Sequence, residues 1–438
     1  MKKKLLSALL AVAVVASSVF GGAASVSAAT QKEINQNFEK CGNFIYKTIK
    51  EPKFGSIGGE WVMYGFGISG YPMSKEYISS YQKSVEDAVK EGFRGTPGIL
   101  HDRKYTEYSR VIVAYSAIGL DPTNIAGYDM VAKLADFDKV IWQGLNGPIW
   151  ALRALDSGNY TIPKDASVKN PTTKQKLINH ILNAQLKDGG WNLYVSDPKE
   201  ADFEKNKSRL KADPDITGMT LSALAPYRNQ TKVKKAIDKG VAALSKIQDS
   251  KGGFSTMGAT TSESSAQVIC GLTACGINPN ADKRFVKNGK SAVDAIMTFY
   301  DEKSGGFRHV NTATTGYKPV VNQMATEQAY YALAEYKSRV PEGTTISKVA
   351  KVNKTTLKAT WKKAVAKTAC DGYQITTSTN ANFNKDVKKA TVKNRNTVSG
   401  KVNGLKKNKT YFVKVRAYKT VNGVKVYGTY SEVKKVKL

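Results

Sequence analysis

Three similar blocks, spaced 63 and 53 residues apart, constrain the fold of this chain more than any other feature. Each block places a Gly-Gly-aromatic turn after an amphipathic run: QLKDGGW at 185–191, QDSKGGF at 248–254 and DEKSGGF at 301–307. This spacing has room for two helices and their loops, and such a period is typical of stacked helical repeats. We therefore expect repeated helix pairs, with Trp191, Phe254 and Phe307 filling the gaps between neighbouring helices.

A second block recurs after each turn. TGMTLSAL at 217–224, SAQVICGL at 265–272 and TEQAYYAL at 326–333 align without gaps, while YSRVIVAY at 108–115 and NGPIWAL at 146–152 are more divergent copies. The copies are rich in small residues and carry few charges, and a helix that is apolar on nearly all sides must be buried. We expect these helices to form an inner ring with the more charged helices outside, which is an α/α barrel, or toroid, from about residue 29 to 340.

The pattern changes to an alternation of apolar and polar residues from residue 341 to 438. About seven short strands, separated by Asn, Gly and Lys turns, predict an all-β sandwich with Trp361 and Tyr373 as core anchors. Leu405 lies six residues before Tyr411. This is the spacing of a tyrosine corner, in which the ring hydroxyl bonds back to nearby backbone.

The Gly-Gly-aromatic repeats resemble those of the terpenoid cyclase and protein prenyltransferase superfamily of α/α toroids, over roughly residues 61 to 336. The C-terminal module resembles a fibronectin type III domain through Trp361, Leu405 and Tyr411. The superfamily includes cyclases, protein prenyltransferases, thioester-containing domains and cobalamin carriers. The resemblance therefore implies a fold and leaves the function to be argued from the site residues.

The first 28 residues have the pattern of a secretory signal peptide: three lysines, an apolar run that ends at Phe20, and small residues up to Ala28, where we expect cleavage. No later segment approaches the roughly 20 apolar residues of a transmembrane helix. We expect a secreted or extracellular protein that is associated with the cell wall. The scattered cysteines, Cys41, Cys270, Cys275 and Cys370, are expected to be reduced and buried, with a Cys41–Cys270 disulfide as the alternative.

The basic charge is concentrated at the C-terminal end. Residues 341–438 hold 23 Lys and Arg against four acids, a net charge of +19 out of +31 for the whole chain. Because the protein is expected to be exported, anionic polymers of a cell wall or membrane surface fit this charge better than nucleic acid does. A charged surface that only maintains solubility is the alternative.

Zinc chemistry finds no support in the sequence. The resemblance to protein prenyltransferases would require a zinc site of Asp, Cys and His, but the only histidines, His101, His180 and His309, lie far apart with no nearby Asp-x-Cys. The Cys-Gly-Glu-Gln stretch of thioester domains is also missing from the sequence. We expect no metal and no cofactor. A corrinoid ligand, as in the cobalamin carriers, stays a hypothesis that no specific residue supports.

The stretch DPDIT at 213–217 resembles the Asp-x-Asp-Asp motif of class II cyclases, with Ile216 in place of the fourth residue. The resemblance implies that Asp215 acts as a general acid with Asp213 as its supporting partner. The alternative is that both acids cap the start of a helix, which is worth about 0.5 to 2 kcal/mol. A structure separates the two interpretations: Asp215 either faces an enclosed apolar pocket or caps its helix beside solvent.

The alignment of the repeats favours capping. Glu263 lies nine residues before Leu272, as Asp215 lies nine before Leu224. An acid at the same helix start in two repeats is better explained by capping than by one special proton donor. Contact between these acids and a ligand is a third interpretation, intermediate between the two.

Other residues on or beside the expected inner helices either pack in the core or line a central cavity. Gln267 and Gln328 align with Met219 and Arg110 at one helix position, where polar side chains either bond neighbouring helices or face a ligand. Tyr331 is open to the same two interpretations. The predicted ligand-binding set is Trp142, Trp150, Asp215, Glu263, Gln267, Gln328 and Tyr330.

The sequence favours a non-enzymatic function. We expect an exported binding protein whose toroid holds a ligand or peptide, while the basic fibronectin type III module contacts anionic envelope polymer. One alternative is a terpenoid cyclase-like enzyme that uses Asp215 as a general acid. The other is a protein-interaction scaffold with a filled toroid.

Overall fold

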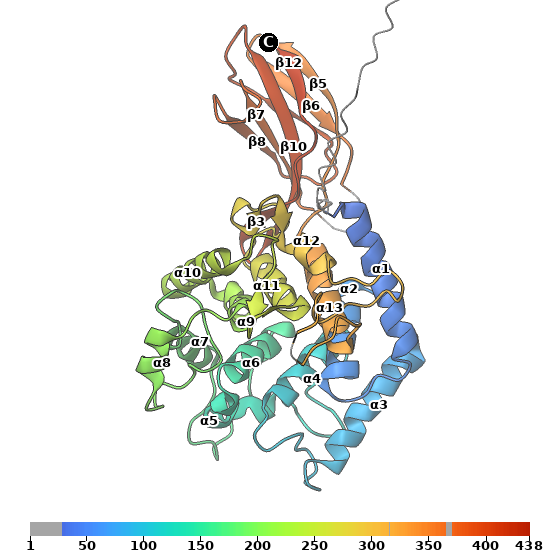
Figure 1. Ribbon diagram of the computed structural model, residues 1–438, viewed down its shortest axis with the longest axis vertical. Coiled ribbons are helices and arrows are strands. Elements are labelled where there is room, and N and C mark those ends of the chain that lie inside the picture. The colour runs from blue at the N-terminus through green and yellow to red at the C-terminus, as the bar shows by residue number, and fades with distance from the viewer. Residues whose placement is uncertain (1–28, 315, 365–369) are drawn as a thin grey trace, which may run out of the picture.

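The computed structural model describes residues 29–314, 316–364 and 370–438. The predicted signal peptide and its cleavage site therefore fall outside the described residues or at their edge. The chain folds into a helical domain followed by a β domain that stands on one end of it (Figure 1). This is the α/α toroid and fibronectin type III-like sandwich that the sequence predicts.

Six helices of the described chain form a closed inner ring. Each packs against the next, and the last packs against the first. In order they are α2 (Trp61–Ser69), α4 (Thr106–Ala117), α6 (Asn146–Ser157), α9 (Pro214–Leu224), α11 (Ser262–Ala274) and α13 (Gln323–Arg339). All five recurring blocks lie in these helices. Helix α2 was not predicted, because its run WVMYGFGIS is apolar and buried over its first six residues but lacks the repeat pattern.

The more charged helices lie outside the ring, as expected (Figure 1). Those with an amphipathic face bury one side: α1 (Gln31–Thr48), α3 (Lys75–Glu91), α7 (Lys174–Asn183) and α10 (Thr231–Ile247). Shorter elements complete the layer: α5 (Phe137–Val140), α8 (Phe203–Arg209), α12 (Ala292–Met297), and the two-residue strand pairs β1 (Ser255–Thr256) with β2 (Ala259–Thr260) and β3 (Val286–Lys287) with β4 (Lys290–Ser291). None of the described helices combines the length and the apolar character that crossing a membrane requires.

The Gly-Gly-aromatic turns join the helix pairs. The first glycines, Gly189, Gly252 and Gly305, have φ of 98°, 85° and 90°, a backbone region that favours glycine. In the middle turn the Gln248 amide donates to the carbonyl of Gly252 and to that of Phe285, each at 3.0 Å. The three aromatic side chains are fully buried in the core, as predicted.

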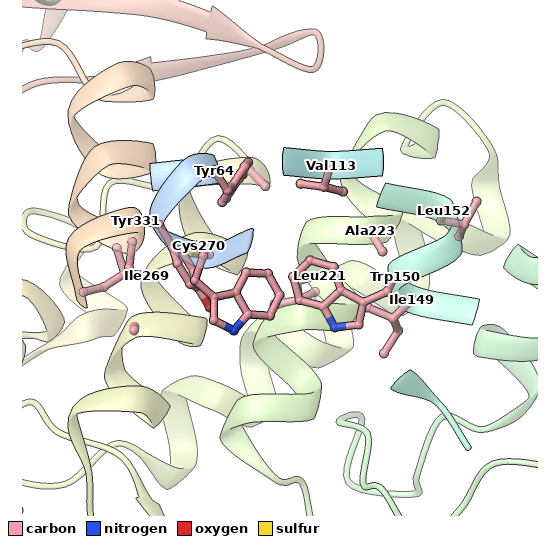
Figure 2. Close-up of a cluster of buried hydrophobic side chains, with 14 of the residues drawn as sticks. Tyr64, Val113, Ile149, Trp150, Leu152, Leu221, Ala223, Ile269, Cys270 and Tyr331 are labelled. Carbon is pink, nitrogen blue, oxygen red and sulfur yellow. The ribbon is translucent and has the colours of Figure 1, made fainter. Parts of the chain in front are cut away.

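The inner ring encloses one continuous apolar core. Figure 2 shows part of it, with side chains from different inner helices directed toward one another, including Tyr64, Val113, Trp150, Leu221 and Tyr331. All four cysteines are buried and free.

The β domain contains two antiparallel sheets. One has the order β5 (Ile346–Asn353), β6 (Thr356–Trp361), β9 (Ser399–Val402), and the other the order β11 (Val424–Tyr427), β10 (Thr410–Val421), β7 (Gly372–Ser378), β8 (Lys388–Val392), with β12 (Lys434–Lys437) also paired to β10. Trp361 and Tyr373 pack in the core with ring centroids 5.1 Å apart. The Tyr411 hydroxyl accepts from the Lys406 amide at 2.8 Å, which forms the predicted tyrosine corner. The chain is not in a strand between β11, which ends at Tyr427, and β12, which begins at Lys434.

The hairpin between β10 and β11 docks onto the helical domain. Its turn residues Asn422 and Gly423 have φ of 47° and 76°, which is the geometry of an Asn-Gly hairpin turn. Val426 is fully buried in the helical core rather than in the sandwich. The Asn422 side chain donates to the carbonyl of Ala274 at the end of α11, at 3.0 Å. The two domains therefore share apolar and hydrogen-bonded contacts.

Candidate functional site

The first-turn residues of all six inner helices line one cavity of about 390 Å³. The inner helices therefore run in the same direction, with their N-terminal ends at this cavity. Its lining mixes aromatic, acidic and amide side chains: Trp61, Thr106, Arg110, Gln143, Asn146, Trp150, Asp215, Met219, Thr256, Thr261, Glu263, Gln267, His309, Met324, Gln328 and Tyr331.

Asp213 and Asp215 have different roles at the start of α9. Asp213 is the N-cap: its Oδ1 accepts from the Ile216 amide at 2.9 Å, and its Oδ2 accepts from the Thr256 hydroxyl at 3.0 Å. Asp215 lines the cavity, and its buried Oδ1 has no hydrogen-bond partner within the described protein. The capping interpretation is therefore correct for Asp213, whereas Asp215 is the second residue of α9 and lies in the cavity wall.

The environment of Asp215 favours its protonated form. Burial, together with the nearby Asp213 and Glu263 carboxylates, raises the pKa of Asp215 to about 7, against a weaker opposing effect of a hydrogen bond from Ser264. A carboxyl group with this pKa is present in both protonation states near neutral pH. It can therefore accept or donate a hydrogen bond toward the cavity.

Glu263 occupies the equivalent position on α11 and pairs with a histidine. Its Oε2 lies 2.8 Å from Nδ1 of His309, while its buried Oε1 has no partner within the described protein. Burial raises the pKa of Glu263, and His309 opposes that shift. Glu263 does not cap α11, because Thr261 accepts the Ser264 amide at that helix start. The sequence analysis considered His309 only as a zinc ligand, and nothing in the local sequence indicates that it pairs with Glu263 across the loop.

Two amides and a phenol form a hydrogen-bonded network on the neighbouring wall. The Gln267 Nε2 donates to Gln328 Oε1 at 2.8 Å and to the Tyr331 hydroxyl. The Oε1 of Gln267 lines the same cavity without a partner within the described protein. Gln267 therefore bonds to a neighbouring helix and also faces the cavity. All four residues that align at this position, Arg110, Met219, Gln267 and Gln328, lie in the cavity wall.

Three aromatic residues, Trp61, Trp150 and Tyr331, form part of the cavity wall. The ring centroid of Trp61 lies 4.8 Å from that of Trp150 and 5.6 Å from that of Tyr331. Figure 2 shows Trp150 and Tyr331 converging from opposite sides of the core cluster. Trp61 is the first residue of α2, the helix that the repeat pattern did not reveal, so the sequence analysis missed it.

Two predicted ligand-binding residues do not line the cavity. Trp142 is 56% exposed and lies beside the Arg103 guanidinium, 5.4 Å from the ring centroid. Tyr330 stacks on Phe38 with ring centroids 4.6 Å apart, and its hydroxyl bonds to that of Ser69. Adjacent residues on a helix point in directions about 100° apart, so Tyr331 faces the cavity and Tyr330 faces the outer layer.

The described residues contain no cluster of side chains that could bind a metal ion. Across residues 29–314, 316–364 and 370–438, no group of three or more His, Cys, Asp or Glu side chains is arranged to hold a metal ion. The pair of Glu263 and His309 lies in the cavity without a third ligand of these types.

The opposite end of the ring is closed by charged side chains and by the β domain. A second cavity of about 290 Å³ lies there, lined among others by Tyr64, Arg153, Arg339 and the hairpin residues Val421 and Asn422. Figure 2 shows a hairpin above Tyr64 and Val113. The two ends of the ring thus differ: two carboxyl groups and several amides line the N-terminal cavity beside one guanidinium, whereas two guanidinium groups line the C-terminal cavity.

Comparisons with known proteins show likeness in fold. The sequence matches no protein-family model and no curated protein. Among solved structures, the fibronectin domains FN1–FN3 of chicken CNTN1 are similar at 25% identity, with a TM-score of 0.18, over 23% of this chain and 31% of that chain. The type II terpene cyclase MstE from Scytonema is similar at 12% identity, with a TM-score of 0.45, over 70% of this chain and 97% of that chain. The ent-copalyl diphosphate synthase from Streptomyces platensis is similar at 18% identity, with a TM-score of 0.39, over 63% of this chain and 49% of that chain.

Proposed function

We propose that this chain is an exported binding protein whose toroid cavity holds a small ligand or part of a peptide. One observation carries the proposal: four cavity-lining residues from three inner helices each have a buried polar atom without a partner in the described protein. These atoms are Asp215 Oδ1, Glu263 Oε1, Gln267 Oε1 and Arg110 Nε. A buried polar atom without a partner costs about 1 to 3 kcal/mol, and a ligand that supplies the missing hydrogen bonds would recover this energy.

The chemistry of these atoms indicates the kind of ligand. Three of the four are oxygens that accept hydrogen bonds, and their residues share the cavity wall with Trp61 and Trp150. A ligand with hydroxyl, amide or amine donors and one apolar face would match both features. A volume of about 390 Å³ fits a small molecule or one to two peptide side chains. No lining residue points specifically to a corrinoid.

A cyclase-like enzyme is the second candidate, and the state of Asp215 favours it. A carboxylic acid with a pKa of about 7, held beside aromatic rings, is suited to protonating a substrate. The cavity is less suited to a hydrocarbon, because Gln143, Asn146 and Gln267 place amides in its wall, and desolvating them beside an apolar chain is costly. We therefore favour binding over cyclisation.

The export and envelope contact are part of the same proposal. The signal-like segment supports export, and the +19 charge of residues 341–438 supports contact with anionic envelope polymer. One contact of the described chain agrees with cleavage after Ala28. The Ala29 nitrogen donates to Asp294 Oδ1 at 2.7 Å, so a mature N-terminal ammonium at this position would gain an ion pair.

A thermal melt of the chain from residue 29 to 438 against a ligand panel tests the proposal. The panel contains short peptides, corrinoids, polyprenyl phosphates and squalene-like hydrocarbons. A ligand at about 100 times its dissociation constant adds roughly 2.7 kcal/mol of stability. Binding in the cavity predicts a shift with a peptide or another polar ligand. The shift should be lost in Gln267→Ala and kept in Trp142→Ala, which changes a residue outside the cavity.

The same panel separates the alternatives. If only an isoprenoid shifts the melt, and wild type but not Asp215→Asn converts it to a product, the protein is a cyclase-like enzyme. If no compound shifts the melt, a protein-interaction scaffold replaces the binding proposal.

A further inference from the structure

We propose that the outer face of the sheet β11-β10-β7-β8 is the surface that binds a phosphodiester-linked polyanion of the cell envelope. The proposal rests on the proposed function and names the surface, defined here as the cationic face: Lys389, Lys414, Arg416, Tyr427, Tyr430 and Lys435. The other lysines of the β domain are then not required for this contact.

The strand register places the cations side by side. On β10, Tyr411, Val413 and Val415 are buried in the sandwich, so the alternating residues Lys414 and Arg416 lie on the outer face. Directly opposite residues of adjacent strands share a face. Lys414 is opposite Thr376, which is itself opposite Lys389, and Phe412 is opposite Lys435. Arg416 continues the row, opposite Gln374 and then Thr391. These paired positions include no carboxylate.

Aromatic rings hold the two central cations in place. Lys414 Nζ lies 3.8 Å from the ring centroid of Phe383 and 4.2 Å from that of Tyr430. The Arg416 guanidinium lies 3.7 Å from the ring centroid of Tyr427 and 4.4 Å from that of Tyr430, and it donates to Gln374 Oε1 at 2.8 Å. A cation already held in one orientation loses little conformational entropy when an anion binds.

The charge of this face is not compensated by the protein. No carboxylate of the described residues forms an ion pair with Lys389, Lys414, Arg416 or Lys435, whereas Lys406 nearby pairs with Asp386. Burial and the repulsion of Arg416, Lys283 and Lys389 lower the pKa of Lys414. Lys283 belongs to the helical domain, so the positive field extends across the domain boundary. An extended row of unpaired cations is suited to a repeating anion rather than to a single small one.

A phosphodiester polymer of polyol or sugar units fits this surface best. Its phosphates would meet the Lys and Arg groups, and its hydroxyls would meet the exposed Thr391 beside them. A lipid surface fits less well, because the large apolar residues that are exposed in the described part of the β domain, Val352, Val387, Val398 and Val433, are single valines outside the cationic face.

The test uses the chain from residue 29 to 438 and a soluble, lipid-free poly(glycerol phosphate) as the probe, with binding measured at several salt concentrations. We expect Lys414→Gln/Arg416→Gln to weaken binding by about tenfold and to reduce its salt dependence. The matched control is Lys358→Gln/Lys401→Gln, which removes the same charge from an exposed cross-strand pair on the other sheet and should change binding less than about twofold. Because Arg416 also bonds to Gln374, Lys389→Gln/Lys435→Gln provides a second test at exposed positions where unfolding is not expected.

Each other outcome overturns the proposal in its own way. Equal losses in the cationic-face variants and the control would mean that envelope contact depends on overall charge, so the proposed function would stand without this face. No binding of the wild type to the polymer would remove envelope contact itself. Tighter binding to phosphatidylglycerol vesicles than to the soluble polymer would assign the face to a membrane.

Discussion

Asp213 and Asp215 are two residues apart, yet only the first caps helix α9, while the second lines the cavity and has a buried oxygen without a partner in the described protein. The difference follows from helix geometry. An N-cap residue lies outside the helix and folds its side chain back onto the free amides, whereas a residue in the first turn points away from the axis. A separation of two residues therefore makes one acid a helix cap and places the other in the wall of the cavity.

The first prediction concerns the stability of Asp215→Asn at different pH values. The pKa of Asp215 is raised from its ordinary 3.8 to about 7 in the folded protein. The folded state therefore holds the proton more tightly, and its stability falls as pH rises between these values. Asn at position 215 does not ionise, so the variant does not lose stability in this way. Its free energy of unfolding relative to wild type should increase by about 2 to 4 kcal/mol from pH 4 to pH 8, as measured by urea denaturation.

Asp213→Ala is the control for this experiment. Loss of the cap should cost about 1 kcal/mol at low pH, where Asp215 is protonated. Removal of the Asp213 charge also lowers the pKa of Asp215, so the pH dependence in this variant should be weaker. A constant difference between Asp215→Asn and wild type across the pH range would contradict the assignment of Asp215 as a buried acid.

The fold could be predicted from the sequence because its repeats are visible in the sequence. Gly252 and its two counterparts mark turns that need a left-handed backbone, and the small-residue blocks mark helices that are buried on all sides. Helix α2 escaped detection because its neighbours, the loop at Gly55 and Gly58 and the turn at Gly70, do not follow the repeat.

The site could be predicted only in part. Gln267 and Gln328 both line the cavity, because alignment of the repeats places equivalent positions on one layer of the ring. The pair of Glu263 and His309 could not be found, because it joins residues 46 apart through a loop without a repeated sequence. Tyr330 and Tyr331 pose a similar difficulty. The rotation of α13 about its axis decides which of the two faces the cavity, and two residues of the same type give no indication of that rotation.

The second prediction tests the Gly-Gly-aromatic turn. Gly252 and Gly258 both have φ of 85°. A Cβ atom at Gly252 would lie 2.4 Å from the carbonyl oxygen of Ser291, whereas one at Gly258 would meet no atom within 4 Å. Gly252→Ala should therefore lower the free energy of unfolding by about 2 to 4 kcal/mol, and Gly258→Ala by about 1 kcal/mol, in chemical denaturation. Equal losses would show that the backbone angle alone, and not the close packing of the turn, requires glycine at 252.

The third prediction concerns the contact between the domains. Val426 is fully buried against the helical core, while Val433 in the same domain is 45% exposed. Val426→Ala should cost about 2 kcal/mol and lower the melting temperature of the helical domain as well as that of the β domain. Val433→Ala should change stability by less than about 0.5 kcal/mol. If Val426→Ala leaves unfolding of the helical domain unchanged, the hairpin does not stabilise the ring.

The last prediction concerns Glu335, which lies buried at the C-terminal end of the ring. It pairs with Arg153 at 3.0 Å and with Arg339, and it accepts from the Tyr64 hydroxyl at 2.5 Å. Burial alone would raise the pKa of Glu335. The charges of Arg339 and Arg153 outweigh this effect and hold the pKa at about 2. Glu335→Gln leaves two buried guanidinium groups without a counterion and should cost about 3 to 5 kcal/mol at pH 7.

The pH dependence distinguishes loss of this charge from a simple packing defect. A lowered pKa stabilises the folded state above the ordinary Glu value, and the contribution is lost as pH falls from about 4.5 toward 2. Urea denaturation at pH 7 and pH 3.5 should therefore show the difference between wild type and Glu335→Gln shrinking by about 1 kcal/mol at the lower pH. A packing defect would give the same difference at both pH values. That outcome would mean that the Glu335 side chain stabilises the protein through packing rather than through its charge.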